Sequence, residues 1–415
     1  MPPEADPLTR NPWVRAAIVV WAVMTVAVCA RSVVQGHRQS VFPVWQLAGH
    51  DWRSGHDLYD HPKGHPTRSG YRYSPLCAAL FVPFDLVPRP VGDVACRLLN
   101  AAAFLAAVGW WLRHGVPGTL TSSQVGIVYL LMAPVALGSL NNGQMNLLMM
   151  AMLLVCLTAV SAERWNLAAW SAAGAVLLKI YPISLVLLVA LIHPRRFLPR
   201  FLVAMAVLCV VPFLLQDPNY VLNQYSFWWM RVRHNDAYRR FWPLPVLYRD
   251  VWLLLTVWKV PLTVPQYTLV QLAGAAGCGV LALVGRWRLG AGKRLLFTLL
   301  CATTVWMLVL GPSPESCTYA VLAPAMAWWL VRSHQEGLLA AHYPGVFGYG
   351  LLLLCTVAGT HSRGIELYHV PGLQPIAVLA FAGGALTGFA AWCARGRSAV
   401  PVAATVPPAE VRLAA

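Results

Sequence analysis

Long apolar runs alternate with short polar stretches along most of this chain. Coiled as a helix, each run spans the hydrocarbon core of a bilayer or falls a few residues short of it. Backbone groups in lipid must be hydrogen-bonded within their own segment, so such runs are expected to be helical. The pattern predicts an all-α polytopic membrane protein with about twelve transmembrane helices. The runs lie at residues 13–30, 92–112, 122–140, 145–161, 166–178, 180–193, 199–215, 267–285, 295–311, 317–331, 343–360 and 371–394.

One apolar stretch, residues 75–88, is too short and too rich in proline to be counted among these spans, and it favours a re-entrant or interfacial helix. With this stretch left out, arginine-rich connections such as 195–200 and 286–294 fall on the cytoplasmic side, where the positive-inside rule expects them. Both termini then lie inside. Segments 166–178 and 180–193 are short, and a single kinked helix is an alternative to two spans there.

The predicted organisation is a single integral membrane domain, residues 1–394, and a disordered cytoplasmic tail, residues 395–415, rich in proline, alanine and valine. Two long polar loops, residues 32–74 and 216–266, fall on the outer face. The sequence contains no repeat of fixed period, which disfavours a transporter built from inverted repeats.

The amino-acid composition supports a membrane protein and excludes other classes of protein. Of the 415 residues, 58% are hydrophobic and 11% are charged, which excludes a soluble globular domain. The net charge of +16 indicates loops that meet anionic lipid head groups. Nucleic acid is not expected as a partner, because no soluble basic domain is long enough to bind it. The ten cysteines lie in or beside apolar runs, and we interpret them as small core residues.

The outer loop at 216–266 carries arginines beside aromatic residues. Guanidinium groups match phosphate oxygens with paired hydrogen bonds, so these arginines are candidate ligands of a phosphate or pyrophosphate. A solvated basic loop is the alternative, because long loops follow the positive-inside rule poorly. The candidates are Arg231, Arg233, Arg239 and Arg240.

Acidic residues are scarce, and three of them, Asp51, Asp57 and Asp60, fall within ten residues of the first outer loop. A carboxylate at the membrane surface can act as a general base on an acceptor hydroxyl while nearby cations stabilise a departing phosphate. The simpler alternative is local loop chemistry, with an Asx turn and a helix N-cap.

Polar residues also gather at the predicted ends of spans. Asn142, Gln144 and Asn146 begin an apolar helix, where capping and a role in a site are both open. Lys179 is a lone cation between two apolar runs, which either extends to the interface or pairs with an anion in a cavity. Glu315 lies in a tight outer turn and would bring a carboxylate to the same outer face as these residues. The histidines of the first loop lack the spacing of a helical metal site, so no metal or other cofactor is predicted.

Five short motifs occur in an order that resembles glycosyltransferase family 87. They are residues 55–59 (GHDLY), 71–76 (YRYSPL), 143–146 (GQMN), 179–182 (KIYP) and 313–316 (SPES). This family groups polytopic mannosyl- and arabinosyltransferases that use polyprenyl-phosphate donors. The resemblance implies a GT-C fold, a lipid-phosphate sugar donor, an extracytoplasmic site and an inverting direct displacement. On this chain it implies a donor phosphate held by Lys179 and the loop arginines. The residues expected to position the sugar or the acceptor are Tyr59, Tyr73, Asn142, Gln144, Asn146 and Glu315.

The chain departs from the family in one respect. Family members carry an aspartate upstream of the 55–59 motif that acts as the base, whereas residues 39–45 here contain no acid. We therefore expect Asp57, ranked ahead of Asp51, to act as the base, unless activity has been lost.

The leading hypothesis is a membrane glycosyltransferase that moves a mannose- or arabinose-like hexosyl or pentosyl group from a polyprenyl-phosphate donor to an extracytoplasmic glycan or glycolipid. Its expected partners are that donor, that acceptor and membrane lipids. Its expected place is a prokaryotic inner or plasma membrane, with the site on the outer face. A lipid or solute transporter or flippase is the alternative. It predicts ionisable residues in mid-span that face a central pathway, and spans such as 199–215 carry none in their middle. A catalytically silent family member is the third hypothesis.

Overall fold

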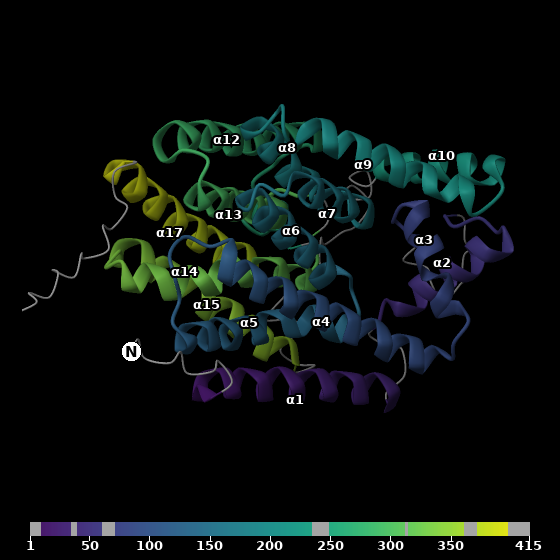
Figure 1. Cartoon of the computed structure of the whole chain (residues 1–415), viewed down its shortest axis with the longest axis horizontal. Coiled ribbons are helices and arrows are strands. Elements are labelled where there is room, and N and C mark those ends of the chain that lie inside the picture. Colours follow the sequence, from purple (N-terminus) through teal and green to yellow (C-terminus); the bar gives the residue numbers. More distant parts are fainter. Residues whose placement is uncertain are drawn as a thin grey trace, which may run out of the picture.

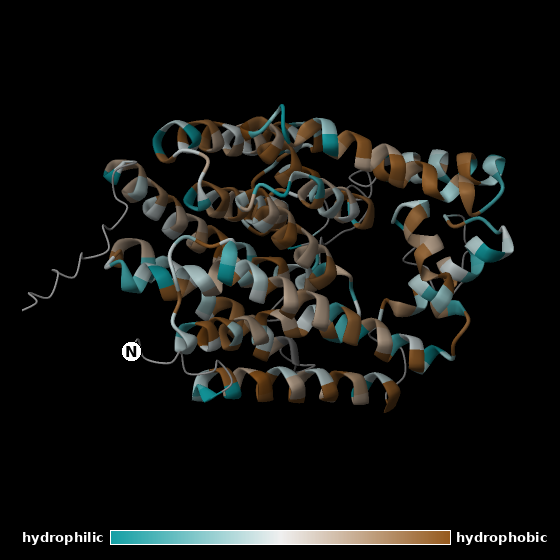
Figure 2. Cartoon of the chain, viewed as in Figure 1, coloured by the Kyte–Doolittle hydropathy of each residue, from teal (hydrophilic) through white to brown (hydrophobic). Residues whose placement is uncertain are grey.

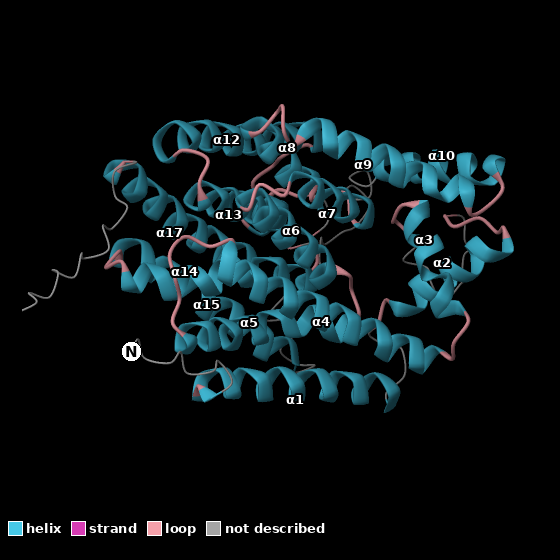
Figure 3. Cartoon of the chain, viewed as in Figure 1, coloured by secondary structure: helices cyan, strands magenta, loops and turns pink. Residues whose placement is uncertain are grey.

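The computed structural model describes residues 10–34, 40–59, 71–234, 249–311, 314–360 and 372–396. Within these ranges every regular element is a helix (Figures 1 and 3). The prediction of an all-α polytopic membrane protein is confirmed. The predicted tail lies outside the described residues from position 397 onward.

The described helices follow one another along the chain. In order they are α1 (Pro12–Val34), α2 (Phe42–Ser54), α3 (Pro75–Asp85), α4 (Arg89–His114), α5 (Ser122–Asn142), α6 (Asn146–Ser161), α7 (Trp165–Leu178), α8 (Ile183–Ile192), α9 (Leu198–Val210), η2 (Val211–Leu214), α10 (Pro218–His234), α11 (Val251–Val257), α12 (Val264–Leu289), α13 (Lys293–Val309), η4 (Ser316–Leu322), α14 (Ala323–Gln335), α15 (Leu339–Thr360) and α17 (Leu373–Arg395). The elements η2 and η4 are 3-10 helices.

Six of the described helices are long and apolar enough to cross a membrane, namely α1, α4, α5, α12, α15 and α17. Many exposed side chains on these helices are apolar, such as Val23 at 63% and Leu269 at 66%, as expected of helices that contact lipid. Figure 2 shows that hydrophobic residues recur along the helices. Shorter apolar helices, among them α6, α7 and α8, accompany them. The count of twelve spans stays a prediction.

The observed helix boundaries resolve the alternative at 166–193 and differ from the prediction at 317–331. Segment 166–193 forms two helices, because α7 ends at Leu178 and α8 begins at Ile183. The run predicted at 317–331 is not one helix: it begins as the 3-10 helix η4 and continues as α14 from Ala323. The polar loops contain helices of their own, α2 in the first and α10 and α11 in the second.

Two glycines allow α15 and α17 to pack closely. A Cβ on Gly348 would lie 2.4 Å from Ala377 O, and one on Gly384 would lie 2.4 Å from Ala341 O. Small residues of this kind let the backbones of membrane helices approach each other. Larger side chains at these two positions would force the helices apart.

The packing brings the polar ends of several helices together. Helix α6 contacts α4 and α7, while η4 contacts both α5 and α6. At one end of the molecule, on the right in Figure 1, α2 and α3 pack against each other, and α10 contacts α3. The turn after α5, the link after α7 and the start of η4 therefore meet in space, although they are far apart in sequence.

Candidate active site

The turn between α5 and α6 carries the first polar residues of the site. Helix α5 ends at Asn142 and is followed by Gly143, which has a φ of 68° and donates its N–H to Leu140 O. This left-handed conformation favours glycine, because other residues place a Cβ too close to the backbone. Helix α6 begins at Asn146, so Gln144 and Asn146 lie where the chain re-enters the apolar bundle. Both side chains are buried.

Lys179 lies in the non-helical link between α7 and α8. Proline at position 182 has no N–H to continue a helix, and the Lys179 backbone is extended, with φ −148° and ψ 138°. The ammonium Nζ donates to Asn146 Oδ1 at 2.5 Å and to Gln144 Oε1 at 3.4 Å. The link thus turns a cation back toward the α5–α6 turn.

Five side chains form a continuous hydrogen-bonded group, which we call the polar cluster: Gln144, Asn146, Lys179, Tyr181 and Glu315. Asn146 Nδ2 donates to Gln144 Oε1 at 2.8 Å, and the Tyr181 hydroxyl donates to Asn146 Oδ1 at 3.2 Å. Gln144 Nε2 donates to Glu315 Oε2 at 2.7 Å. One amide, that of Gln144, therefore connects the cation to a carboxylate.

Glu315 and Asn142 attach η4 to this group. At the start of η4 the Glu315 N–H donates to Thr318 Oγ1 at 3.2 Å, and Asn142 Nδ2 donates to Cys317 Sγ at 3.5 Å. Asn146 Nδ2 also donates to the Cys317 carbonyl at 3.0 Å. Four of the predicted site residues, Asn142, Gln144, Asn146 and Glu315, are thus brought together with Lys179.

At short range the Lys179 ammonium contacts neutral amide oxygens. Among the described residues no carboxylate forms an ion pair with its ammonium within 4.0 Å. Burial lowers the pKa of the Lys179 ammonium, and the Cys317 thiol and the Glu315 carboxylate partly oppose this shift. A buried cation without a close anionic partner is costly, and it marks a place where an anion from outside is favoured.

Tyr73 connects the polar cluster to the first outer loop. Its ring lies 6.0 Å from Lys179 Nζ and 3.8 Å from the ring of Trp45, measured between ring centroids for the aromatic pair. The Tyr59 hydroxyl donates to the Tyr73 carbonyl at 2.7 Å. The two predicted tyrosines are therefore neighbours, and only Tyr73 borders the cation.

The two predicted catalytic aspartates lie beyond these tyrosines. Asp51 is buried near the C-terminus of α2, where its Oδ1 is 3.7 Å from His56 Nδ1. Asp57 Oδ1 accepts from the Tyr59 N–H at 2.8 Å, which is the geometry of an Asx turn. Burial raises the pKa of the Tyr220 hydroxyl on α10, and the negative charges of Asp51 and Asp57 add to this shift. The carboxylate inside the polar cluster is that of Glu315, so the role of either aspartate as a base stays a prediction.

The predicted phosphate-binding arginines are only partly within the described residues. Arg231 donates to the Tyr59 carbonyl, and the Arg233 guanidinium lies 5.7 Å from the ring centroid of Trp229 on the exposed side of α10. Arg239 and Arg240 lie outside the described residues. Arg231 thus faces the first outer loop, and the assignment of these arginines to a phosphate stays a prediction.

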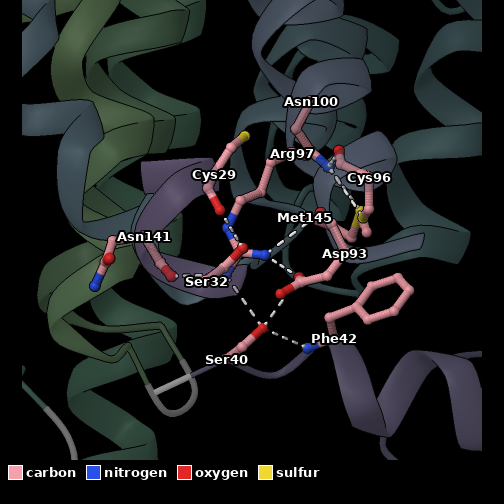
Figure 4. Close-up of polar contacts among 10 residues, drawn as sticks. All are labelled: Cys29, Ser32, Ser40, Phe42, Asp93, Cys96, Arg97, Asn100, Asn141 and Met145. Carbon is pink, nitrogen blue, oxygen red and sulfur yellow. Dashed lines mark hydrogen bonds and ion pairs between the residues drawn. The ribbon is translucent and has the colours of Figure 1, made fainter. Parts of the chain in front are cut away.

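Two features escaped the sequence analysis. Tyr181 belongs to the polar cluster, and only its place in the 179–182 motif pointed to it. Asp93 and Arg97 form a buried ion pair one turn apart in α4 (Figure 4). Opposite charges four residues apart in a membrane span are themselves a signal, because ionisable residues there are rare and functional.

No group of three or more histidine, cysteine, aspartate or glutamate side chains gathers in a metal-binding arrangement within the described ranges. The expectation that no metal or other cofactor takes part stays a prediction.

Loss of the Asn146 side chain is expected to destabilise the protein, because Asn146 is fully buried and forms hydrogen bonds with four partners at once. Asn146→Ala leaves buried polar groups unsatisfied and should lower the free energy of unfolding by about 1–3 kcal/mol. Unfolding in detergent, followed by tryptophan fluorescence, measures the change. Asn166→Ala is the control, since Asn166 is exposed and contacts Arg200 only at the surface. Equal stability of Asn146→Ala and wild type would contradict this account.

The fold and the polar cluster define a polytopic membrane protein with a buried cation among hydrogen-bonded polar side chains. The model of glycosyltransferase family 87 matches residues 71–312, more than half of the 415-residue chain. The chain belongs to this family and is a membrane glycosyltransferase. The predicted resemblance is confirmed.

A solved structure is also similar to this chain. It is the crystal structure of ArnT from Cupriavidus metallidurans bound to undecaprenyl phosphate. The two share 15% sequence identity with a TM-score of 0.45, over 91% of this chain and 77% of that chain. No curated protein matches the sequence.

Proposed function

We propose that this chain transfers a mannose- or arabinose-like sugar from a polyprenyl-phosphate donor to an extracytoplasmic glycan or glycolipid, with inversion at the anomeric carbon. The observation that carries the proposal is the environment of Lys179. Its ammonium is held by Asn146 and Gln144, and no carboxylate of the described residues forms an ion pair with it within 4.0 Å. Membership of family 87, whose transferases use lipid-phosphate donors, supports the donor class.

The donor phosphate would complete the charge balance of Lys179. An anion beside a desolvated ammonium is stabilised far more than in water, and the leaving phosphate gains negative charge as the glycosidic bond breaks. Asn146 holds the ammonium, and the Tyr181 hydroxyl donates to the same Asn146 oxygen, which limits the reorganisation needed during the reaction. The isoprenoid tail would remain among the apolar helices, which suits a donor that enters laterally from the lipid.

The chemical step is a single displacement. The acceptor hydroxyl oxygen forms a bond to the anomeric carbon, the bond from that carbon to the phosphate oxygen breaks, and the acceptor proton passes to a carboxylate. Asp57 is our first candidate for this base and Asp51 the second, because both belong to the outer loop that the acceptor meets. Glu315 is a third candidate, favoured by its hydrogen bond to Gln144.

The proposal is tested with purified protein in detergent or nanodiscs. Labelled polyprenyl-phosphate mannose and polyprenyl-phosphate arabinose are supplied separately with a lipid-linked glycan extract, and the label in the glycan fraction is measured. Transfer from one donor, with release of polyprenyl phosphate in equal amount, is the expected result. Movement of a labelled lipid across vesicle membranes without transfer from any donor would instead favour the flippase alternative.

A further inference from the structure

A buried ion pair in α4 contacts the end of α5, close to the turn that carries Gln144. The Arg97 guanidinium contacts the Asp93 carboxylate one helical turn away, and each side chain is only 1% exposed. Removing two charges from water is costly, and such a pair is often no more stabilising than apolar residues of the same size. The remaining contacts of the pair therefore indicate what it does.

Arg97 joins two segments that are distant in sequence. Its Nη2 donates to Asn141 O at 2.9 Å, at the end of α5, and to Ser40 Oγ at 3.2 Å, just before α2 (Figure 4). The Ser40 hydroxyl in turn donates to Asp93 Oδ1 at 3.3 Å. The neighbouring backbones are also bonded directly, because the Val41 N–H donates to Asn142 O at 2.9 Å.

We call the contacts of Arg97 with Asn141 and Ser40 the clamp. The α5–α6 turn that the clamp holds carries Gln144 and Asn146 of the polar cluster. A Cβ on Gly143 would lie 3.1 Å from Ser40 Oγ and 3.4 Å from Arg97 Nη2, so the turn fits closely against the clamp. Gln144 follows Gly143 directly, and its side chain contacts Lys179 and Glu315. A shift of this turn therefore moves the groups that hold the cation.

We propose that Asp93 and Arg97 are positioning residues for the glycosyl transfer. They hold the α5–α6 turn against the start of α2, and thereby set the placement of Gln144 and Asn146 around Lys179. The inference rests on the proposed function. Within the described residues, the hydrogen bonds of this pair reach the α5–α6 turn and Ser40 and not the polar cluster, so its effect on transfer would be indirect.

Arg97→Lys separates positioning from folding. Lysine keeps a positive charge beside Asp93, so the carboxylate remains compensated. It lacks the planar fork that reaches Asp93, Asn141 and Ser40 at the same time. A purely structural ion pair tolerates this exchange, whereas a clamp does not. Ser40→Ala tests the same clamp without altering a charge.

The experiment compares wild type, Arg97→Lys, Ser40→Ala and the control Arg332→Lys. Arg332 forms a partly buried pair with Glu336, also four residues apart, away from the polar cluster. Sugar transfer, the thermal midpoint and hydrogen–deuterium exchange of peptides containing Val41 and Gln144 are measured on each protein. We expect Arg97→Lys to keep its thermal midpoint and donor KM close to wild type, to lose about 10–100-fold in kcat and to exchange faster in both peptides. Ser40→Ala should show the same changes on a smaller scale, and Arg332→Lys should show none.

Wild-type kcat in both Arg97→Lys and Ser40→Ala would overturn the positioning role, as would unchanged exchange in both peptides. Should Arg97→Lys fail to fold, Ser40→Ala alone decides in the same way. Failure of the proposed function appears differently, as absence of transfer by the wild-type protein itself from any polyprenyl-phosphate sugar.

Discussion

Lys179→Met is expected to remove nearly all sugar transfer while leaving the protein folded. The ammonium is the buried cation of the polar cluster, and its loss removes the charge that stabilises the departing phosphate. Removal of one such preorganised group lowers kcat on the order of 10²–10³-fold. The fold should persist, because Asn146 Oδ1 still accepts from the Tyr181 hydroxyl at 3.2 Å. Initial rates with labelled donor, together with the thermal midpoint, measure both effects.

Lys259→Met is the matched control for this experiment. Lys259 is exposed and belongs to the second predicted outer loop, so it adds to the general positive field without being buried. Its replacement should change transfer less than about twofold, since exposed charges are screened by salt. A loss as large as that of Lys179→Met would mean that overall charge, and not the polar cluster, attracts the donor.

The pH dependence of the reaction provides a second test of Lys179. Burial lowers the pKa of its ammonium below that of an exposed lysine. Only the charged form attracts phosphate, so KM for the donor should rise as the pH increases through this lowered pKa, and acid pH should not weaken binding through Lys179. In Lys179→Arg the guanidinium stays charged, and this alkaline rise should disappear. A rise that persists in Lys179→Arg would assign it to another group.

The helices could be predicted from the sequence because lipid leaves the backbone few choices. An apolar run such as 122–140 must satisfy its own hydrogen bonds, and it becomes α5 nearly residue for residue. The run at 317–331 was predicted as one helix, whereas its first residues form the 3-10 helix η4, which begins where the Glu315 N–H donates to Thr318 Oγ1. Helix α2 was hidden in a polar loop because its thirteen residues bury one side only.

The site could be predicted in part for a similar reason. Gln144, Asn146 and Lys179 were singled out because polar residues at the ends of apolar runs need partners, and they prove to be partners of one another. Which carboxylate joins them could not be predicted, because it depends on how η4 packs against α6. The contact of Arg97 with Asn141 could not be predicted from the sequence either, because the two residues lie 44 positions apart.

Asp57→Asn is expected to lower kcat by about 10²–10⁴-fold, the usual effect of removing a general base. The substitution separates the two roles open to this residue. Asparagine keeps the oxygen that accepts from the Tyr59 N–H, so the Asx turn remains, whereas the ability to take a proton is lost. A large loss of transfer at an unchanged thermal midpoint therefore reports on proton transfer and not on the turn.

Asp217→Asn is the control, because the Asp217 Oδ1 accepts from the N–H groups of Asn219 and Tyr220 at the start of α10, in a similar turn at an exposed site. It should transfer sugar at the wild-type rate. Asp51→Asn and Glu315→Gln complete the series. If Asp57→Asn remains active and Glu315→Gln does not, the base is the carboxylate bonded to Gln144, and Asp57 only shapes the loop. The base would then lie one amide away from Lys179, so the acceptor would have to approach beside the donor phosphate and not from the side of α2.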